Sequence, residues 1–186
     1  MFKISLFICF TSLLLLSCDT NKRITTDFNC DIKTSGILEN VTDVKELFSI
    51  KIPVNWKTNL YQDEIQSSIF SADTTKQLSE TVLLDVTFIE KNVNFNEAFK
   101  LKQAQENLSK NLITIKSKEL LLLNKPAYYM LLKGKKGKFS YQVCNTFIKV
   151  NSSNFILAKT EVYGDSLVNS RLCKSFSLIE NIKILQ

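Results

Sequence analysis

The second half of the chain consists of runs in which apolar and polar residues alternate, separated by short polar turns. The runs cover residues 112–123, 127–133, 138–150 and 155–163, and the turns between them are 124–126, 134–137 and 151–154. A period of two is typical of strands, and connections this short favour antiparallel neighbours. The sequence therefore predicts a four-strand antiparallel meander, which confines the fold to classes with a large antiparallel sheet.

Two segments change this period to that of a helix. Between residues 94 and 110 the apolar residues recur at helical spacing, and Asn94 with Glu97 suits a capping box at the start. Residues 164–166 begin a last helix, whose apolar residues form one stripe: Val168, Leu172, Phe176 and Ile179. Three more strands are predicted before the first helix, at 47–52, 67–72 and 81–90.

These elements predict an α+β domain with one antiparallel β-sheet of about six to seven strands, covered by two helices. The chain has 186 residues. A domain of roughly this size buries about 70% of its unfolded surface, which is enough for a core that needs no metal. The side chains expected to be buried together in that core are Phe48, Ile50, Ile52, Trp56, Leu172 and Phe176.

A short apolar segment near the N-terminus ends in Leu-Leu-Leu-Leu-Ser-Cys at residues 13–18. Lys3 supplies a positive charge before it, and the segment is too short to span a bilayer and be retained there. The pattern resembles the lipobox of bacterial lipoproteins. The resemblance implies cleavage before Cys18 and lipidation of its thiol, and two or more acyl chains make such an anchor stable.

On this interpretation the chain has three parts: a signal peptide at 1–17, a lipidated tether and entry segment at 18–45, and a folded domain at 46–186. Residues 19–27 are expected to be too polar to pack. The protein is expected in the cell envelope, held on a membrane by its lipid and facing the periplasm. The sequence leaves the choice between inner and outer membrane open.

Three of the five cysteines remain after Cys9 is cleaved off and Cys18 is lipidated. One disulfide among Cys30, Cys144 and Cys173 is expected in an oxidising compartment, with three buried thiols as the alternative. The chain contains no histidine, and no two of these cysteines are spaced as Cys-x-x-Cys. Neither a metal site nor a cofactor is therefore predicted.

One cluster of charge stands out in a chain of net charge +6: Lys133, Lys135, Lys136 and Lys138, interleaved with Gly134 and Gly137. It suits either a solvated hairpin tip or a contact with an anionic surface, such as lipid headgroups or an acidic partner. The other lysines are spread along the chain, and no aromatic residues alternate with the cluster. A nucleic-acid partner is therefore not predicted.

The sequence offers little support for catalysis. Without histidine there is no Ser-His or Cys-His pair, and the glycine patterns of nucleotide-binding loops are absent. Asp85, beside apolar residues on its strand, is the best candidate for a carboxylate with a perturbed pKa, and no second acid can be paired with it. We therefore predict that the protein is not an enzyme.

Residues 48–56, with the sequence Phe-Ser-Ile-Lys-Ile-Pro-Val-Asn-Trp, and 173–176, Cys-Lys-Ser-Phe, resemble the PsbP-like (PsbP/Mog) superfamily. The similarity in element order covers roughly residues 46–185. It implies an adaptor-like domain that works by binding partners, and no cofactor-binding residues can be placed on this chain.

Two functions follow as expectations. The favoured one is a lipid-anchored interaction module of the cell envelope with a protein partner. The alternative is a carrier that binds a lipid or a small hydrophobic ligand between sheet and helix. A large exposed apolar patch would favour the first function, and a closed apolar cavity the second.

Overall fold

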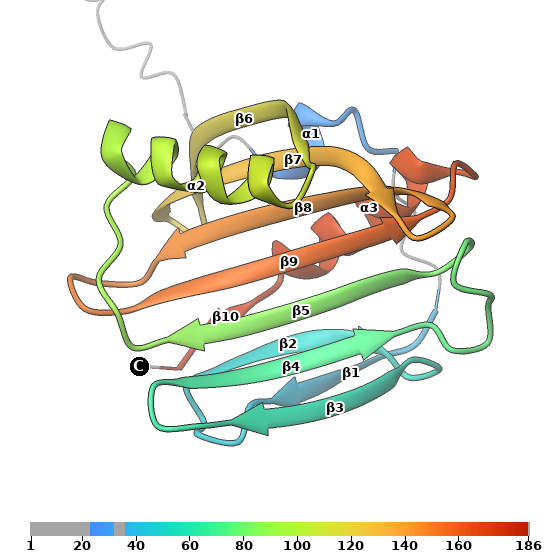
Figure 1. The fold of residues 1–186 in the computed structure, drawn as a ribbon. Helices are drawn as coiled ribbons and strands as arrows, with labels where there is room; N and C mark the ends of the chain where they lie inside the picture. Colours follow the sequence, from blue (N-terminus) through green and yellow to red (C-terminus); the bar gives the residue numbers. More distant parts are fainter. Residues whose placement is uncertain (1–22, 32–35, 186) are drawn as a thin grey trace, which may run out of the picture.

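The computed structural model describes residues 23–31 and 36–185, which form three helices and ten strands (Figure 1). In chain order these are α1 (Ile24–Asp27), β1 (Leu38–Thr42), β2 (Phe48–Pro53), β3 (Lys57–Gln62), β4 (Gln66–Ala72), β5 (Val82–Ile89), α2 (Glu97–Ser109), β6 (Ile113–Leu122), β7 (Lys125–Lys136), β8 (Phe139–Lys149), β9 (Phe155–Tyr163), α3 (Val168–Ile179) and β10 (Lys183–Ile184). The predicted signal peptide and Cys18 lie outside the described residues.

Seven strands form one antiparallel sheet in the order β3-β4-β5-β9-β8-β7-β6. The predicted meander is its β6-to-β9 half, so the α+β class with a seven-stranded antiparallel sheet is confirmed. A second sheet, β1-β2-β10, was not predicted. Because alternation within β2 shows that it is a strand but not which strand it pairs with, the sequence could not place β2 outside the large sheet.

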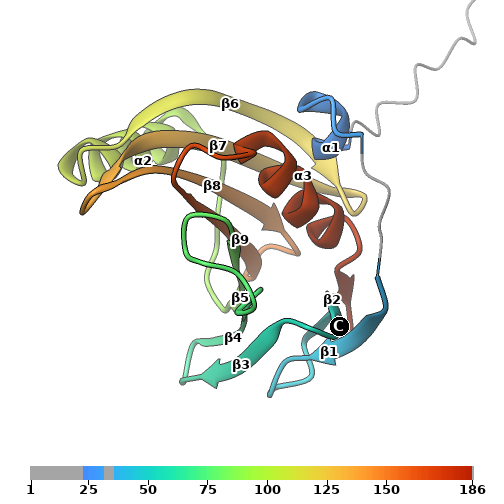
Figure 2. The same cartoon turned by 90° about the vertical axis from the view of Figure 1, so that its right-hand side faces the viewer.

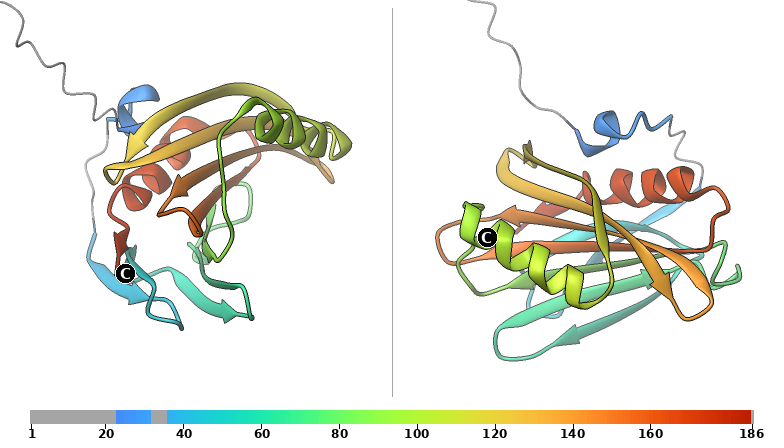
Figure 3. Two further views of the ribbon diagram at one scale, coloured as in Figure 1. Left: turned by 90° about the vertical axis from the view of Figure 1, so that its left-hand side faces the viewer. Right: turned by 45° about the horizontal axis from the view of Figure 1, so that its top comes forward.

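The large sheet is curved, with α3 and the small sheet inside the curve and α2 on the outer face (Figures 2 and 3). The inner face holds the main core. All six side chains predicted to be buried together belong to this one cluster, namely Phe48, Ile50, Ile52, Trp56, Leu172 and Phe176. Burial of these apolar surfaces is the main force that holds α3 and β2 against the sheet.

Polar contacts hold two successive turns of α3 on that core. The buried Arg171 guanidinium donates hydrogen bonds to the carbonyl oxygens of Thr81 at 2.9 Å and Tyr163 at 2.8 Å. The hydroxyls of Thr160 and Ser175 lie 2.7 Å apart in a buried hydrogen bond between β9 and α3. These bonds orient the helix, because each would leave a buried polar group unpaired if α3 shifted along the sheet.

Residues 24–30 and 38–42, within the segment expected to be a tether and entry segment, are instead packed onto the domain. Ile24 is fully buried in the main core, and β1 pairs with β2 along its whole length. The contacts of α1 and the residues after it are Thr25 N to Glu180 Oε1 at 2.9 Å, Asp27 to Lys118 at 2.6 Å, the rings of Phe28 and Phe176 with centroids 4.7 Å apart, and a Cys30–Cys173 disulfide. The mostly polar composition of 19–27 concealed the role of Ile24, which enters the core and, with Phe28 and the disulfide, holds residues 24–30 on the domain.

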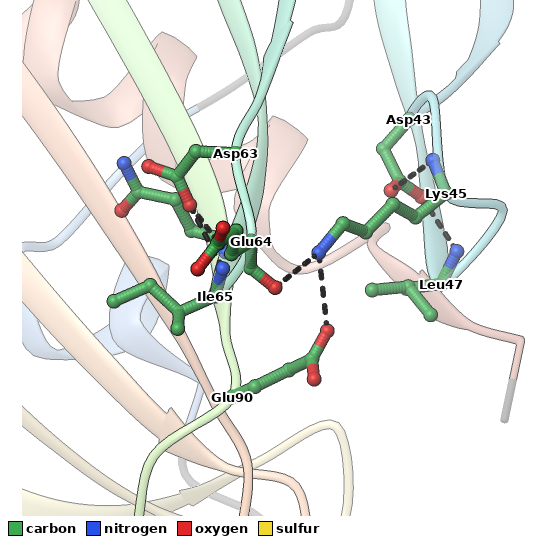
Figure 4. A network of polar contacts seen from close by, with 8 residues as sticks. Asp43, Lys45, Leu47, Asp63, Glu64, Ile65 and Glu90 are labelled. Carbon is green, nitrogen blue, oxygen red and sulfur yellow. Dashed lines mark hydrogen bonds and ion pairs between the residues drawn. The ribbon is translucent and has the colours of Figure 1, made fainter.

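A polar joint connects the small sheet to the large one at the β1–β2 turn (Figure 4). The buried Asp43 carboxylate accepts hydrogen bonds from the backbone N–H groups of Leu47 at 2.7 Å and Phe48 at 2.8 Å, which closes the turn. Lys45 then reaches across to the Glu64 carbonyl oxygen at 3.0 Å and the Glu90 carboxylate at 3.2 Å. The two sheets are therefore linked by side chains as well as by the shared core.

Two local predictions were wrong. The N-cap of α2 is Asn96, whose side-chain oxygen accepts a hydrogen bond from Phe99 N, and not Asn94. The segment 134–137 is not a four-residue turn, because β7 continues to Lys136 and the turn begins at Gly137, with φ +60°. Gly134 lies within the strand, where a Cβ would stand 2.7 Å from the Asn111 carbonyl oxygen. A side chain at 134 would therefore push away the loop between α2 and β6.

Candidate functional site: a cationic cleft on the outer sheet face

Helix α2 covers only the β6-to-β8 side of the outer face (Figure 1). Phe99 contacts Tyr128 and Phe147 with ring centroids 6.1 and 5.2 Å apart, which seats the helix on β7 and β8. Towards β9 and β5, the described part of the chain places no helix on this face. The half-buried side chains on this part of the outer face are therefore accessible to a partner that approaches the sheet.

Strand register brings ionisable groups together beside the C-terminal end of α2. Lys159 on β9 pairs with Asp85 on β5 and with Asn145 on β8, so these three side chains form one row across the outer face. Glu161 lies two residues further along β9 and pairs with Val143. Side chains two apart on a strand share a face, so Lys159 and Glu161 lie next to each other.

The Glu161 carboxylate is held by four side chains. Its Oε2 accepts hydrogen bonds from the hydroxyls of Tyr141 at 2.8 Å and Tyr163 at 3.0 Å, and Lys136 approaches the same oxygen at 3.4 Å. Lys159 forms an ion pair with Oε1. Although burial on its own raises the pKa of Glu161, the bonds from Lys159 and Tyr141 and the charge of Lys136 outweigh it and lower that pKa.

Asp85 shows the opposite behaviour. Burial raises its pKa, and the Thr87 hydroxyl, at 3.1 Å, and the charge of Lys159 offset this only in part. The sequence therefore pointed to the right strand position for a perturbed carboxylate. It missed Glu161, because the partners that fix Glu161 come from three strands whose register is not written in any local pattern.

A cleft of about 340 Å³ opens above these groups. It is lined by Asn107, Lys110, Leu112, Lys135, Lys136, Tyr141, Val143, Asn145 and Lys159. Four of these nine residues are lysines, and none of the described residues that line the cleft is acidic. The amides and the tyrosine hydroxyl add neutral hydrogen-bonding groups. Such a surface attracts an anionic group, and its size suits a few side chains or one small ligand.

The four lysines singled out in the sequence do not act together. Lys135 and Lys136 line the cationic cleft, and Lys136 also pairs with Glu161. Lys133 points to a separate hollow, which it shares with Lys135, Ile113 and Ile115. Lys138 lies in the hairpin turn with its ammonium 5.5 Å from the Phe139 ring centroid. Lys133 and Lys135 lie on one face of β7 and Lys136 on the other, so the sheet distributes the cluster between two surfaces, and Lys135, near the end of the strand, borders both.

The cysteines have structural positions. Cys30 and Cys173 form the disulfide that attaches the α1 segment to α3, with Cα atoms 5.4 Å apart. Cys144 is fully buried in the main core, and this burial raises the pKa of its thiol to about 12. Residues 23–31 and 36–185 contain no group of three or more metal-ligating side chains and no helix long and apolar enough to span a membrane.

The fold is similar to solved structures at low sequence identity. The Ran-binding protein Mog1p of Saccharomyces cerevisiae has a TM-score of 0.55 at 7% identity, over 82% of this chain and 97% of that chain. Cyanobacterial PsbP (CyanoP) of Synechocystis has a TM-score of 0.55 at 10% identity, over 83% and 98%. LpqN, involved in cell envelope biogenesis of Mycobacterium tuberculosis, has a TM-score of 0.50 at 12% identity, over 89% and 99%.

No protein-family model matches the chain, and neither does any curated protein sequence. The structural likeness shows a PsbP/Mog-like fold, as the resemblance of residues 48–56 and 173–176 suggested.

Proposed function

We propose that this protein is a lipid-anchored binding module of the cell envelope, which holds a protein partner by an acidic segment bound in the cationic cleft. The observation that carries the proposal is the cleft itself, in which four lysines, from β7, β9 and the residue that caps the C-terminus of α2, surround a hollow of about 340 Å³. Charge complementarity of this kind speeds association and selects an acidic partner over others.

The geometry of Glu161 supports a binding role for the cleft. Because its carboxylate is bonded to Tyr141, Tyr163, Lys136 and Lys159, two of the four lysines are held in place before any partner arrives. A surface that is already ordered loses less conformational entropy on binding than one with free lysine side chains. The network that fixes these lysines is thus part of the proposed recognition surface.

The structural neighbours support the same class of function. Mog1p, which shares the fold, binds the protein Ran, and LpqN is involved in cell envelope biogenesis. The lipobox-like residues 13–18 support anchoring of this chain through Cys18, which is five residues before Arg23, the N-cap of α1. Together these observations favour an envelope adaptor over a catalyst.

The alternative of a hydrophobic-ligand carrier has less support. It needs space between the large sheet and α3, and there the side chains of Phe48, Phe88 and Phe176 are fully buried in one continuous core. The cationic cleft lies on the other face and is lined mainly by polar side chains.

The proposal is tested by capture from detergent-solubilised envelopes with the full-length protein. Lys110→Glu reverses one charge in the cleft, and Lys57→Glu on β3 makes the same change in an exposed residue far across the sheet. We expect the first variant to lose a captured partner by about tenfold, since like charges brought together oppose binding, and the second to keep it. Equal capture by both variants would refute the cleft as the binding site.

The anchor is tested separately with Cys18→Ser. Because the thiol that would accept the lipid is gone, we expect the variant to lose partitioning into the detergent phase after signal removal. Unchanged partitioning of the processed variant would contradict lipidation at Cys18.

A further inference from the structure

The N-terminal end of β6 exposes two large apolar side chains side by side. Ile113 is 67% exposed and Ile115 is 51% exposed. They line a shallow hollow of about 570 Å³ together with Asn111, Lys133, Gly134 and Lys135. This hollow, which we call the β6 surface, is separate from the cationic cleft, although Lys135 borders both.

The β6 surface exists because cover on the inner face stops short of this end of the sheet. Leu131 on β7 belongs to the main core and is buried. Lys133, two residues further along the same strand, is exposed and pairs with Ile113. The register between β6 and β7 shifts between Thr114 and Lys116, so Ile115 is the extra residue of a bulge. Such a bulge also protects an edge strand from pairing with another chain, which argues against a strand of a partner as the occupant.

The charge near the β6 surface is positive. Lys133 and Lys135 line it, and Lys116 is the next residue after Ile115. The nearest acidic side chains along β6 and α1 are already paired, Glu119 with Lys100 at 2.8 Å and Asp27 with Lys118 at 2.6 Å. Apolar side chains ringed by lysines suit the boundary between anionic headgroups and acyl chains.

The opposite end of β6 lies beside the point where the described chain begins. Arg23 lines a cavity of about 320 Å³ with Leu121 and the turn that follows β6. Leu121 is 41% exposed. Arg23 is five residues after Cys18 in the chain, and this length can span at most about 18 Å. A lipid on Cys18 would therefore hold this edge of the sheet, and not the distant β3 edge, close to the bilayer (Figures 1 and 2).

We infer that the β6 surface is a lipid-contact site, at which Ile113 and Ile115 enter the headgroup region of an anionic membrane and Lys133 and Lys135 bind its phosphates. The argument from tether length rests on the proposed anchor at Cys18, whereas exposure and charge do not. Contact along β6 leaves the cationic cleft on the outer sheet face, open to a protein partner.

The first test uses the full lipidated chain in vesicles. An environment-sensitive fluorophore is attached at Ile115→Cys, and at Val54→Cys as the control, because Val54 is also exposed and lies in the turn that follows β2. In vesicles of phosphatidylcholine with phosphatidylglycerol we expect a blue-shifted emission at position 115 and none at 54. Vesicle-bound protein with aqueous emission at both positions would refute the lipid contact, whereas failure of the chain to join vesicles at all would refute the anchor.

The second test removes the anchor, using the chain from Asp19 onward, which keeps every described residue. Its affinity for the same anionic vesicles is compared in Lys133→Gln with Lys135→Gln and in a matched control, Lys51→Gln with Lys57→Gln. We expect the first pair to weaken binding by about 25-fold at low salt, about fivefold for each lysine, and the control pair to leave it unchanged. Equal loss in both pairs would show attraction by net charge alone and would overturn the site.

Discussion

The two faces of the large sheet are built differently. The inner face, under α3 and the small sheet, carries a continuous apolar core with Phe48, Phe88 and Phe176 fully buried. The outer face carries a second, smaller apolar cluster, in which Phe99 of α2 packs against buried side chains such as Met130 and Leu132. Beside it, where α2 gives no cover, lie Glu161 and Asp85 among tyrosines and lysines. The larger core on the inner face is wholly apolar at its centre, whereas the smaller cluster on the outer face gives way to charged groups, which are buried there only because they have partners.

The largest loss of stability is expected when an aromatic ring is removed from the inner face, and comparing it with the outer face tests the difference between the two faces. Phe176→Ala should lower the free energy of unfolding by about 3–5 kcal/mol, since it leaves a cavity among rigid neighbours. Phe99→Ala, in a half-buried ring on α2, should cost roughly 1–2 kcal/mol. Urea unfolding measures both, and equal losses would show that the faces do not differ in this way.

The disulfide should come next in size. Cys30 and Cys173 are separated by 143 residues, so the bond restricts a long loop in the unfolded chain. Replacing both with serine should cost about 2–5 kcal/mol and loosen α1, as measured by thermal unfolding and by proteolysis near residues 24–30. Cys144→Ala is the control, because it changes a buried cysteine that is not in the disulfide. If it lowers stability by as much as the double replacement, without any change in proteolysis near residues 24–30, the loss of stability reflects core packing and not the disulfide.

The smallest effects on stability are expected from replacing two acidic residues of the outer face. These effects should depend on pH and be opposite in sign. The lowered pKa of Glu161 means that its charged form stabilises the fold above the ordinary glutamate pKa, and that this is lost as pH falls through the folded value. Glu161→Gln should therefore lower stability at neutral pH and match the parent at low pH.

The raised pKa of Asp85 has the reverse consequence, since its charged form costs stability above the folded value. Asp85→Asn should raise stability at neutral pH, and the gain should disappear as pH falls through the ordinary aspartate pKa. Urea midpoints from neutral to acidic pH measure both variants. A shift of the same sign in the two variants would contradict the assigned environments.

Much of the fold could be predicted from the sequence, because the patterns that indicate it involve residues close together in the chain. The alternation in 112–163, the short turns and the stripe of α3 each depend on residues close in sequence, and they gave the strands of the meander nearly at their observed bounds. The misses, namely β1, β3, β10 and α1, are short elements with little apolar periodicity. They form because a neighbour already in place offers hydrogen bonds or a core surface.

The candidate site was harder to predict than the fold. Lys135 and Lys136 stood out as part of a charge cluster, but Lys110 and Lys159 did not, because they are distant in sequence and join them only through α2 packing and β8–β9 pairing. Glu161 looked like one polar residue in an alternating strand. Of its two tyrosine partners, Tyr163 is two residues along the same strand, whereas Tyr141 lies diagonally across on β8 and reaches Glu161 only in the observed register.

By itself the sequence determined the class of fold, the two helices, the core side chains and the lipobox-like N-terminal pattern, since each is written in spacing and composition over a few residues. Only the tertiary structure decided which sheet β2 joins, that residues 24–30 pack on α3, that Cys30 pairs with Cys173, and that four lysines share one cleft. These features depend on contacts between residues far apart in the chain, where a shift of one residue in strand register moves a side chain to the other face of the sheet.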